Sequence, residues 1–162
     1  MDLELCQLDK IYLSDLTNYS KILNQRNKLL KDLIFRRELI DTLSVWDMQL
    51  IEYGQRIIRR RSAFIKELSE IVYSIHKNIS GNREELRLTY EPGVQADQFE
   101  KELDRVRQKD MKYCQTSVGP HRDDLLFQIG DVDIRTFGSQ GQQRTSALSL
   151  KLSEIELVKN LI

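Results

Sequence analysis

The feature that most constrains this sequence is a long apolar stripe with helical spacing. Between residues 43 and 79, large apolar side chains recur at intervals of three, four or seven residues: Leu43, Trp46, Leu50, Tyr53, Ile57, Phe64, Leu68, Ile71, Ile75 and Ile79. This spacing places them on one side of an α-helix. Ser44 and Asp47 resemble a capping box, Gly81 is a typical helix stop, and no proline precedes Pro92. We therefore predict one helix of about 35 residues, roughly 50 Å long at 1.5 Å per residue.

A second stripe precedes it and predicts another helix over residues 8–40. Its apolar members are Leu8, Tyr12, Leu16, Tyr19, Leu23, Leu30 and Ile34. With only a short connection around Ile40–Thr42, the two helices are expected to pair as an antiparallel hairpin and to bury their stripes together. Residues 1–82 are thus predicted to form a helical arm, in the manner of a short coiled coil. A compact bundle is the alternative, because periodicity does not distinguish the two.

The pattern changes after Gly81 and predicts strands. Leu86, Leu88 and Tyr90 alternate with polar residues up to Glu91-Pro92-Gly93. A helix over 96–109, with Phe99, Leu103 and Val106 on one face, precedes strands predicted at 113–118, 125–129 and 132–137. Gly130-Asp131 favours a type II′ turn between the last two. The predicted fold class is mainly α with a small antiparallel β part (α+β), with residues 83–162 as the second domain.

Charge and cysteine content restrict the class of protein. Lys+Arg and Asp+Glu both total 25 among 162 residues, so any nucleic-acid surface must be local. No run approaches the roughly 18 apolar residues that span a bilayer. Cys6 and Cys114 have no metal-like spacing and follow no signal peptide, which favours reduced thiols in a cytoplasmic protein without a membrane partner.

The clearest candidate site is a polar, glycine-bearing loop at residues 137–145, followed at once by apolar residues with helical spacing. Unpaired N–H groups at a helix N-terminus favour anions. Gly141 permits close backbone approach, and Ser139, Gln140 and Gln142 offer neutral hydrogen-bonding groups. The alternative is a polar turn that only caps a core helix.

Several strings resemble known proteins. Ser139-Gln140-Gly141-Gln142 is similar to the Ser-Gly-Gly-Gln signature of ABC-type ATPases, with Gln140 in place of the first glycine. The wider string FGSQGQQRTSALSLKL from Phe137 resembles the RecF family of bacterial DNA-repair ATPases. So do SVGPHRDDL from Ser117, LNQRNKLLK from Leu23 and the Val45-Trp46-Asp47 step. The resemblance covers nearly all of the chain, and it favours residues 83–162 as a partial ABC-type ATPase lobe joined to the arm.

The resemblance implies a function for the longer protein. Ser139, Gln140, Gly141 and Gln142 would contact the γ-phosphate of ATP held by the opposing subunit, so that ATP and Mg²⁺ join two subunits. The resemblance also implies binding to DNA near single-strand/double-strand junctions, and cooperation with RecR and RecO in loading RecA at gaps. Rival hypotheses are a coiled-coil segment of another SMC-like chromosome-maintenance ATPase and a helical scaffold without a nucleotide role.

The motifs that would hold the nucleotide within one subunit are missing. The sequence contains no G-x-x-x-x-G-K-[ST] phosphate loop and no Gly-Lys pair. We therefore interpret the chain as an internal segment of a longer ATPase. It is expected to have no catalytic residue of its own, no ATPase activity, and no bound ATP when isolated.

Two further groups of residues are candidates for binding. The densest basic group consists of Arg56, Arg59, Arg60 and Arg61, with Arg36 and Arg37 before them. These residues are candidates for DNA or partner contact, as is Arg122, and the alternative for the group is a solvated helix face interleaved with acidic residues. His121-Arg122-Asp123-Asp124 has metal-binding residue types, but neighbours on an extended chain point to opposite faces, so we predict a structural or interface role and no metal site. The alternative there has Arg122 paired with a carboxylate and His121 solvated. His76 lies beside the apolar stripe and is expected to pack or cap.

Overall fold

The computed structural model describes residues 1–161. They form two compact units, one made of residues 1–60 and 92–123 and the other of residues 61–91 and 124–161. The structure is mainly α with one small antiparallel sheet, which confirms the predicted fold class. The boundaries of the units do not coincide with residue 82. The division into an arm (1–82) and an ATPase lobe (83–162) stays a prediction.

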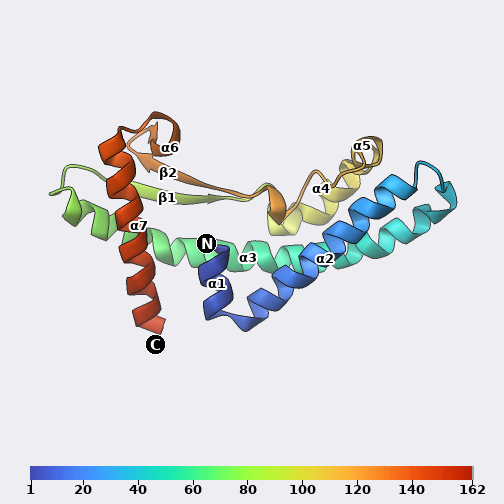
Figure 1. Cartoon of the computed structure of the whole chain (residues 1–162), viewed down its shortest axis with the longest axis horizontal. Helices are drawn as coiled ribbons and strands as arrows, with labels where there is room; N and C mark the ends of the chain where they lie inside the picture. The colour runs from blue at the N-terminus through green and yellow to red at the C-terminus, as the bar shows by residue number, and fades with distance from the viewer. Residues whose placement is uncertain (162) are drawn as a thin grey trace. The chain divides into compact units, whose positions relative to one another are not determined.

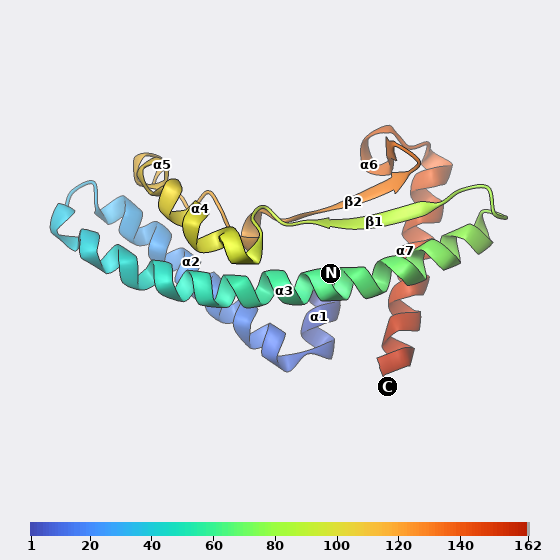
Figure 2. The same cartoon turned by 180° about the vertical axis from the view of Figure 1, so that it is seen from behind.

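The first unit is built on helices that run antiparallel. It contains α1 (Asp2–Leu8), α2 (Lys10–Asp32) and the N-terminal part of α3 (Ile40–Ile79), with the short helix η1 (Arg37–Leu39) before α3. Both views show α2 lying alongside this part of α3 (Figures 1 and 2). Three ion pairs show that the two helices run in opposite directions: Arg26–Asp47, Asp15–Arg56 and Asp9–Arg60. Residues nearer the start of α2 pair with residues farther along α3.

The helix predicted over 8–40 is shorter at both ends. Asp9 interrupts it, because its carboxylate accepts hydrogen bonds from the N–H groups of Ile11 and Tyr12, both at 3.0 Å, and so caps α2. At the other end α2 stops at Asp32, and a turn leads to η1. No glycine or proline marks that stop in the sequence, so the connection was predicted too short.

Helix α3 begins four residues before the predicted cap at Ser44. Asp47 does not complete a capping box, since its carboxylate accepts from Arg26 Nε at 2.6 Å. The predicted stop is correct: α3 ends at Ile79, and Gly81 follows with φ +63°. Toward this end the buried stripe shifts to Val72 and His76, both fully buried, whereas Ile79 is exposed.

The rest of the first unit packs on these helices. The predicted helix over 96–109 is divided into η2 (Ala96–Gln98), α4 (Phe99–Arg105) and α5 (Arg107–Tyr113). Its predicted core face is confirmed, since Phe99, Leu103 and Val106 are buried. Gly54 of α3 makes this packing possible: a Cβ there would overlap the Phe99 ring and lie 3.2 Å from Tyr19 Cε2.

The second unit contains the sheet. β1 (Leu86–Glu91) pairs antiparallel with β2 (Asp124–Ile129), and β2 pairs with β3 (Val132–Asp133). The register places Leu86 opposite Ile129. Gly130 turns the chain between β2 and β3 with φ +60°. Helices α6 (Ile134–Phe137) and α7 (Gln140–Leu161) follow, and α6 contacts both β2 and α7 (Figure 2).

One predicted strand is wrong, and another is shorter than predicted. Residues 113–118 form the end of α5 and a loop, because Thr116 and Ser117 bond to side chains instead of to a neighbouring strand. The strand predicted at 132–137 ends at Asp133, whose carboxylate accepts from Arg135 N at 3.0 Å and so starts α6. In both segments a polar side chain overrides the strand preference of its neighbours.

Over residues 1–161, no helix is long and apolar enough to cross a membrane. Neither Cys6 nor Cys114 forms a disulfide bond within this range.

Candidate functional site

The predicted anion site lies at the junction of α6 and α7. Only Gly138 and Ser139 separate the two helices, so the predicted loop over 137–145 is shorter than expected and Gln140 is already helical. Ser139 Oγ accepts from Gln142 N at 3.1 Å, and Gln142 Oε1 accepts from Ser139 N at 3.0 Å. This reciprocal pair is a capping box with glutamine at its fourth position.

The capping box leaves donors free. Among residues 1–161, the N–H groups of Gln140 and Gly141 have no acceptor, and the Ser139 hydroxyl has none for its hydrogen. Ser139, Gln140 and Gly141 are exposed, and Gln142 is half-buried. A Cβ at Gly141 would meet only Ser139 Oγ, at 3.9 Å. Nothing among residues 1–161 therefore requires glycine at position 141.

The helix behind these donors is held by buried polar contacts. His76 is fully buried; its Nδ1 lies 2.8 Å from Ser149 Oγ and its Nε2 lies 3.0 Å from Glu84 Oε2. Ser149 Oγ also donates to the Thr145 carbonyl at 2.8 Å, and Thr145 Oγ1 donates to the Gly141 carbonyl at 2.8 Å. The predicted packing role of His76 is thus accompanied by a specific contact with α7.

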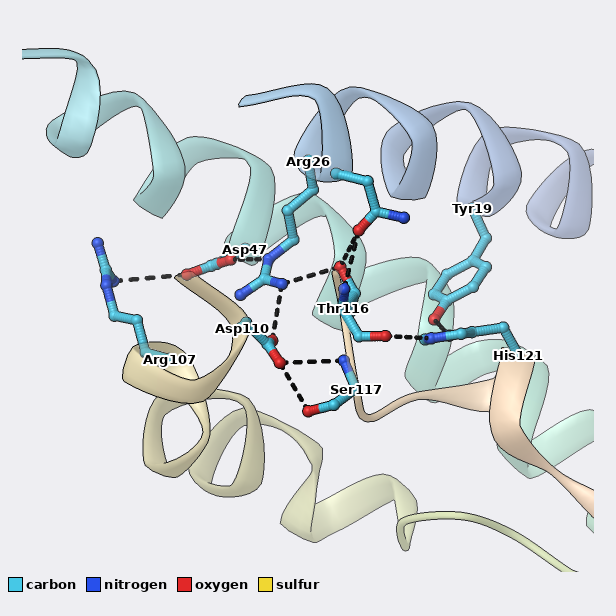
Figure 3. Close-up of polar contacts among 9 residues, drawn as sticks. Tyr19, Arg26, Asp47, Arg107, Asp110, Thr116, Ser117 and His121 are labelled. Atoms are coloured by element: carbon cyan, nitrogen blue, oxygen red, sulfur yellow. Dashed lines mark hydrogen bonds and ion pairs between the residues drawn. The ribbon is translucent and has the colours of Figure 1, made fainter. Parts of the chain in front are cut away.

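A second polar centre, in the first unit, surrounds Arg26 (Figure 3). The Arg26 side chain is fully buried. Its Nε donates to Asp47 at 2.6 Å, and its Nη1 donates to Asp110 Oδ2 and to Thr116 Oγ1, both at 2.9 Å. Asp110 Oδ1 accepts from the N–H and the hydroxyl of Ser117, at 3.1 and 2.6 Å. One arginine thereby ties α2, α3, α5 and the loop after α5 together.

His121 belongs to the same centre. Its Nε2 lies 2.9 Å from the Thr116 carbonyl, which can only accept, so Nε2 carries a hydrogen. Its Nδ1 then accepts from the Tyr19 hydroxyl at 2.7 Å (Figure 3). Burial lowers the pKa of His121 below its usual value, which favours this neutral form. Both ring nitrogens thus have protein partners, although the residue as a whole remains exposed.

The other residues of the His121–Asp124 string point to separate partners. Asp123 accepts from Gly93 N at 2.8 Å, and Asp124 pairs with Arg135 at 3.0 Å. Arg122 has no carboxylate within 4 Å among residues 1–161, so the alternative that paired it is wrong. Among the same residues, no three His, Cys, Asp or Glu side chains gather as a metal ion would require.

The basic group on α3 is only partly free. Arg56 pairs with Asp15 and Glu52, Arg60 pairs with Asp9, and Arg61 is buried. Arg59 is exposed and has no ion pair among residues 1–161, and Arg36 and Arg37 are exposed on the connection to α3. Their contact with DNA or a partner stays a prediction.

Sequence reasoning missed the Arg26 centre, although its members lie in strings already singled out for their resemblance. Arg26 and Asn27 belong to the Leu23 string, Asp47 ends the Val45 step, and Ser117 and His121 belong to the Ser117 string. Asn27 Oδ1 accepts from Thr116 N at 2.9 Å and from its hydroxyl at 2.7 Å. The three strings therefore meet at one buried network.

Comparisons with known proteins confirm the resemblance that these strings indicate. No family model matches the chain. The DNA replication and repair protein RecF of Agathobacter rectalis is 64% identical over 162 residues, and that of Lachnospira eligens is 57% identical over 164 residues. Each match covers 100% of this chain and 45% of the relative. A solved structure, the recombination mediator protein RecF-ATP in the RecFOR pathway, matches with a TM-score of 0.92 at 35% identity, covering 99% of this chain and 45% of that one.

These matches and the mainly α fold define the chain as a segment of a DNA replication and repair protein. It spans less than half the length of the relatives it matches. Over this segment, the chain belongs to the RecF family.

Proposed function

We propose that this chain serves, within a longer RecF protein, as the segment whose α7 N-terminus contacts the γ-phosphate of an ATP bound by a second subunit. The supporting observation is the set of free donors on the exposed surface: the N–H groups of Gln140 and Gly141 and the Ser139 hydroxyl. Backbone donors at a helix N-terminus favour an anion through both hydrogen bonding and the helix dipole. The open space at Gly141 permits close approach.

We further propose what the longer protein does. The longer protein would bind ATP with Mg²⁺ and dimerise when ATP is bound. It would also bind DNA at single-strand/double-strand junctions and act with RecR and RecO to load RecA at gaps. Support comes from the relatives, which are DNA replication and repair proteins, and from the related structure of the recombination mediator protein RecF-ATP in the RecFOR pathway.

The isolated chain is proposed not to bind ATP appreciably. Its sequence has no phosphate-loop lysine, and the donors on α7 would contact only the end of a nucleotide held elsewhere. Calorimetric titration of the 162-residue chain with Mg-ATP should therefore show no saturable heat. Saturable binding would contradict the proposal that the nucleotide is shared between subunits.

The decisive experiment is sedimentation of a longer RecF protein that contains this segment, with and without ATP. Ser139→Arg should abolish ATP-driven dimerisation, because it fills the space that the phosphate would occupy, while ATP binding by each subunit persists. Thr136→Arg, an exposed position three residues upstream, is the matched control and should still dimerise. If Ser139→Arg also dimerises normally, α7 has no nucleotide role and the hypothesis of a helical scaffold is favoured.

A further inference from the structure

A cavity in the first unit has an unusual lining. It lies between α5 and the segment that follows, has a volume of about 510 Å³, and is lined by Lys109, Asp110, Tyr113, Gln115, Ser117 and Arg122. Most of these side chains present hydrogen-bond donors, and only the Tyr113 ring is largely apolar. The cavity therefore suits a polar, acceptor-rich ligand better than an apolar one.

The charge of this cavity is positive. Lys109 and Arg122 are exposed, and neither has a carboxylate within 4 Å among residues 1–161. The one acidic member, Asp110, is fully buried, and its two oxygens are occupied by Arg26 and Ser117. Lys112 adds a nearby cation, with its Nζ 5.4 Å from the centre of the Tyr113 ring.

This local charge departs from the rest of the chain. The sequence as a whole has a formal net charge of zero, and on α3 Arg56 and Arg60 are neutralised by ion pairs. The cavity instead combines two cations, which have no ion pair among residues 1–161, with a rigid floor, because the Arg26 network fixes Asp110 and Ser117. A lysine and an arginine beside such a floor favour phosphate oxygens, which both side chains bind well.

We propose that this cavity binds the phosphodiester backbone of one nucleic-acid strand, with Lys109 and Arg122 each contacting a phosphate. The inference rests on the proposed function in that it names a place where the longer protein would hold DNA. Phosphate contacts carry no sequence information, so this binding should not depend on base sequence. An acidic peptide is disfavoured because the lining offers it almost no apolar anchor.

The test uses the 162-residue chain and a fluorescent 20-nucleotide oligo-dT, with binding followed by anisotropy at several salt concentrations. Each phosphate contact to a single strand contributes about −0.7 to the slope of log K against log salt. Lys109→Gln/Arg122→Gln should therefore flatten the slope by about 1.4 and weaken binding roughly tenfold at low salt. Lys28→Gln/Lys101→Gln is the matched control, since both lysines are exposed and have no ion pair among residues 1–161; it should bind nearly as the parent does.

Four results would overturn the proposal. The isolated chain could fail to bind the oligonucleotide, or the cavity variant could keep the parent's slope and affinity. Polyglutamate of equal charge could compete as well as unlabelled oligo-dT, which would make the site one for acidic protein segments. Inorganic phosphate could compete at the same phosphate concentration, which would make it a site for free phosphate. Weak competition by both, with the flattened slope, would support the proposal.

The proposal for nucleic acid and the proposal for ATP can be refuted separately. Ser139→Arg should leave oligonucleotide binding by the isolated chain unchanged. Conversely, a longer RecF protein with Lys109→Gln/Arg122→Gln should still dimerise with ATP. Loss of dimerisation in that variant would show that the two cations act in assembly, which would contradict their assignment to nucleic acid.

Discussion

Arg26 and Asp110 form an ion pair in which neither side chain is exposed, with Nη1 and Oδ2 2.9 Å apart. Removing one member of such a pair leaves a buried charge without compensation, which typically costs about 3–5 kcal/mol. We therefore expect Asp110→Ala to lower the free energy of unfolding, measured by urea denaturation, by about 3 kcal/mol.

The matched control for this prediction is Asp97→Ala, an exposed acid in η2 with no ion pair among residues 1–161, which should change stability by less than about 0.5 kcal/mol. The double variant Arg26→Met/Asp110→Ala should recover part of the loss, because it removes the unpaired cation as well. Equal effects of Asp110→Ala and Asp97→Ala would contradict the structural role of the network.

Two glycines that are both helical should respond oppositely to alanine. At Gly54 the new Cβ would overlap Phe99, so overpacking of about 1–3 kcal/mol should outweigh the gain in helix propensity. At Gly141 the Cβ meets nothing closer than 3.9 Å, so alanine should be neutral or slightly stabilising in this chain. Thermal unfolding of the two variants tests the difference. A stabilising Gly54→Ala would show that α3 and α4 are not packed this closely.

The stability of the chain should depend on pH through His121. Burial lowers its pKa below the usual 6.5, so the unfolded chain binds a proton more readily than the folded one. The contribution of the neutral His121 ring to the free energy of unfolding is complete above pH 6.5 and is lost as the pH falls below that value. His121→Gln cannot take up this proton, so its urea midpoint should change less than the parent's between neutral and mildly acidic pH. A parallel decline in both proteins would contradict the prediction.

The sequence predicts helices and strands well where the spacing of apolar residues follows one period. It predicts them poorly where the hydrogen bond of one polar side chain decides where an element begins or ends. The stripe on α3 and the alternation of Leu86 and Leu88 were sufficient to locate a long helix and a strand. Asp9 and Asp133, by contrast, act as helix caps, and nothing in the local pattern distinguishes a capping aspartate from a solvated one. The Arg26 network joins residues 84 positions apart, a distance that periodicity cannot bridge.

The candidate site on α7 was predicted from its residue types and from resemblance, but its detail was not. Sequence alone suggested Ser139 and Gly141 as anion contacts, and equally a simple cap. The structure shows a capping box whose bonds leave Gln140 N, Gly141 N and the Ser139 hydroxyl as free donors. The structure therefore shows the cap, and the anion contact stays a prediction, which the sedimentation experiment with ATP tests.

His76 should stabilise α7 through its buried contact with Ser149. His76→Leu keeps a side chain of similar bulk but loses both hydrogen bonds, at a cost of about 1–3 kcal/mol. Tyr73 lies on the same helix as His76, and Tyr73→Phe loses only an exposed hydrogen bond to Glu85, so it should cost less than about 0.5 kcal/mol. Hydrogen exchange should be faster in α7 of the His76 variant, and unchanged exchange there would contradict the coupling.

Contact between the basic group on α3 and RecR is best tested at Arg59. Reversing Arg60 or Arg61 would confuse binding with folding, because Arg60 pairs with Asp9 and Arg61 is buried. Arg59 is exposed and has no ion pair among residues 1–161, so Arg59→Glu should leave the fold intact. If RecR binds this face through acidic side chains, the reversal should weaken its capture by the chain severalfold at low salt, with the effect fading as salt is raised. Lys21→Glu, an exposed reversal on α2, is the control. Equal capture of RecR by the parent and by Arg59→Glu would exclude this face as the RecR contact and leave Arg36 and Arg37, on the connection before α3, as the next candidates.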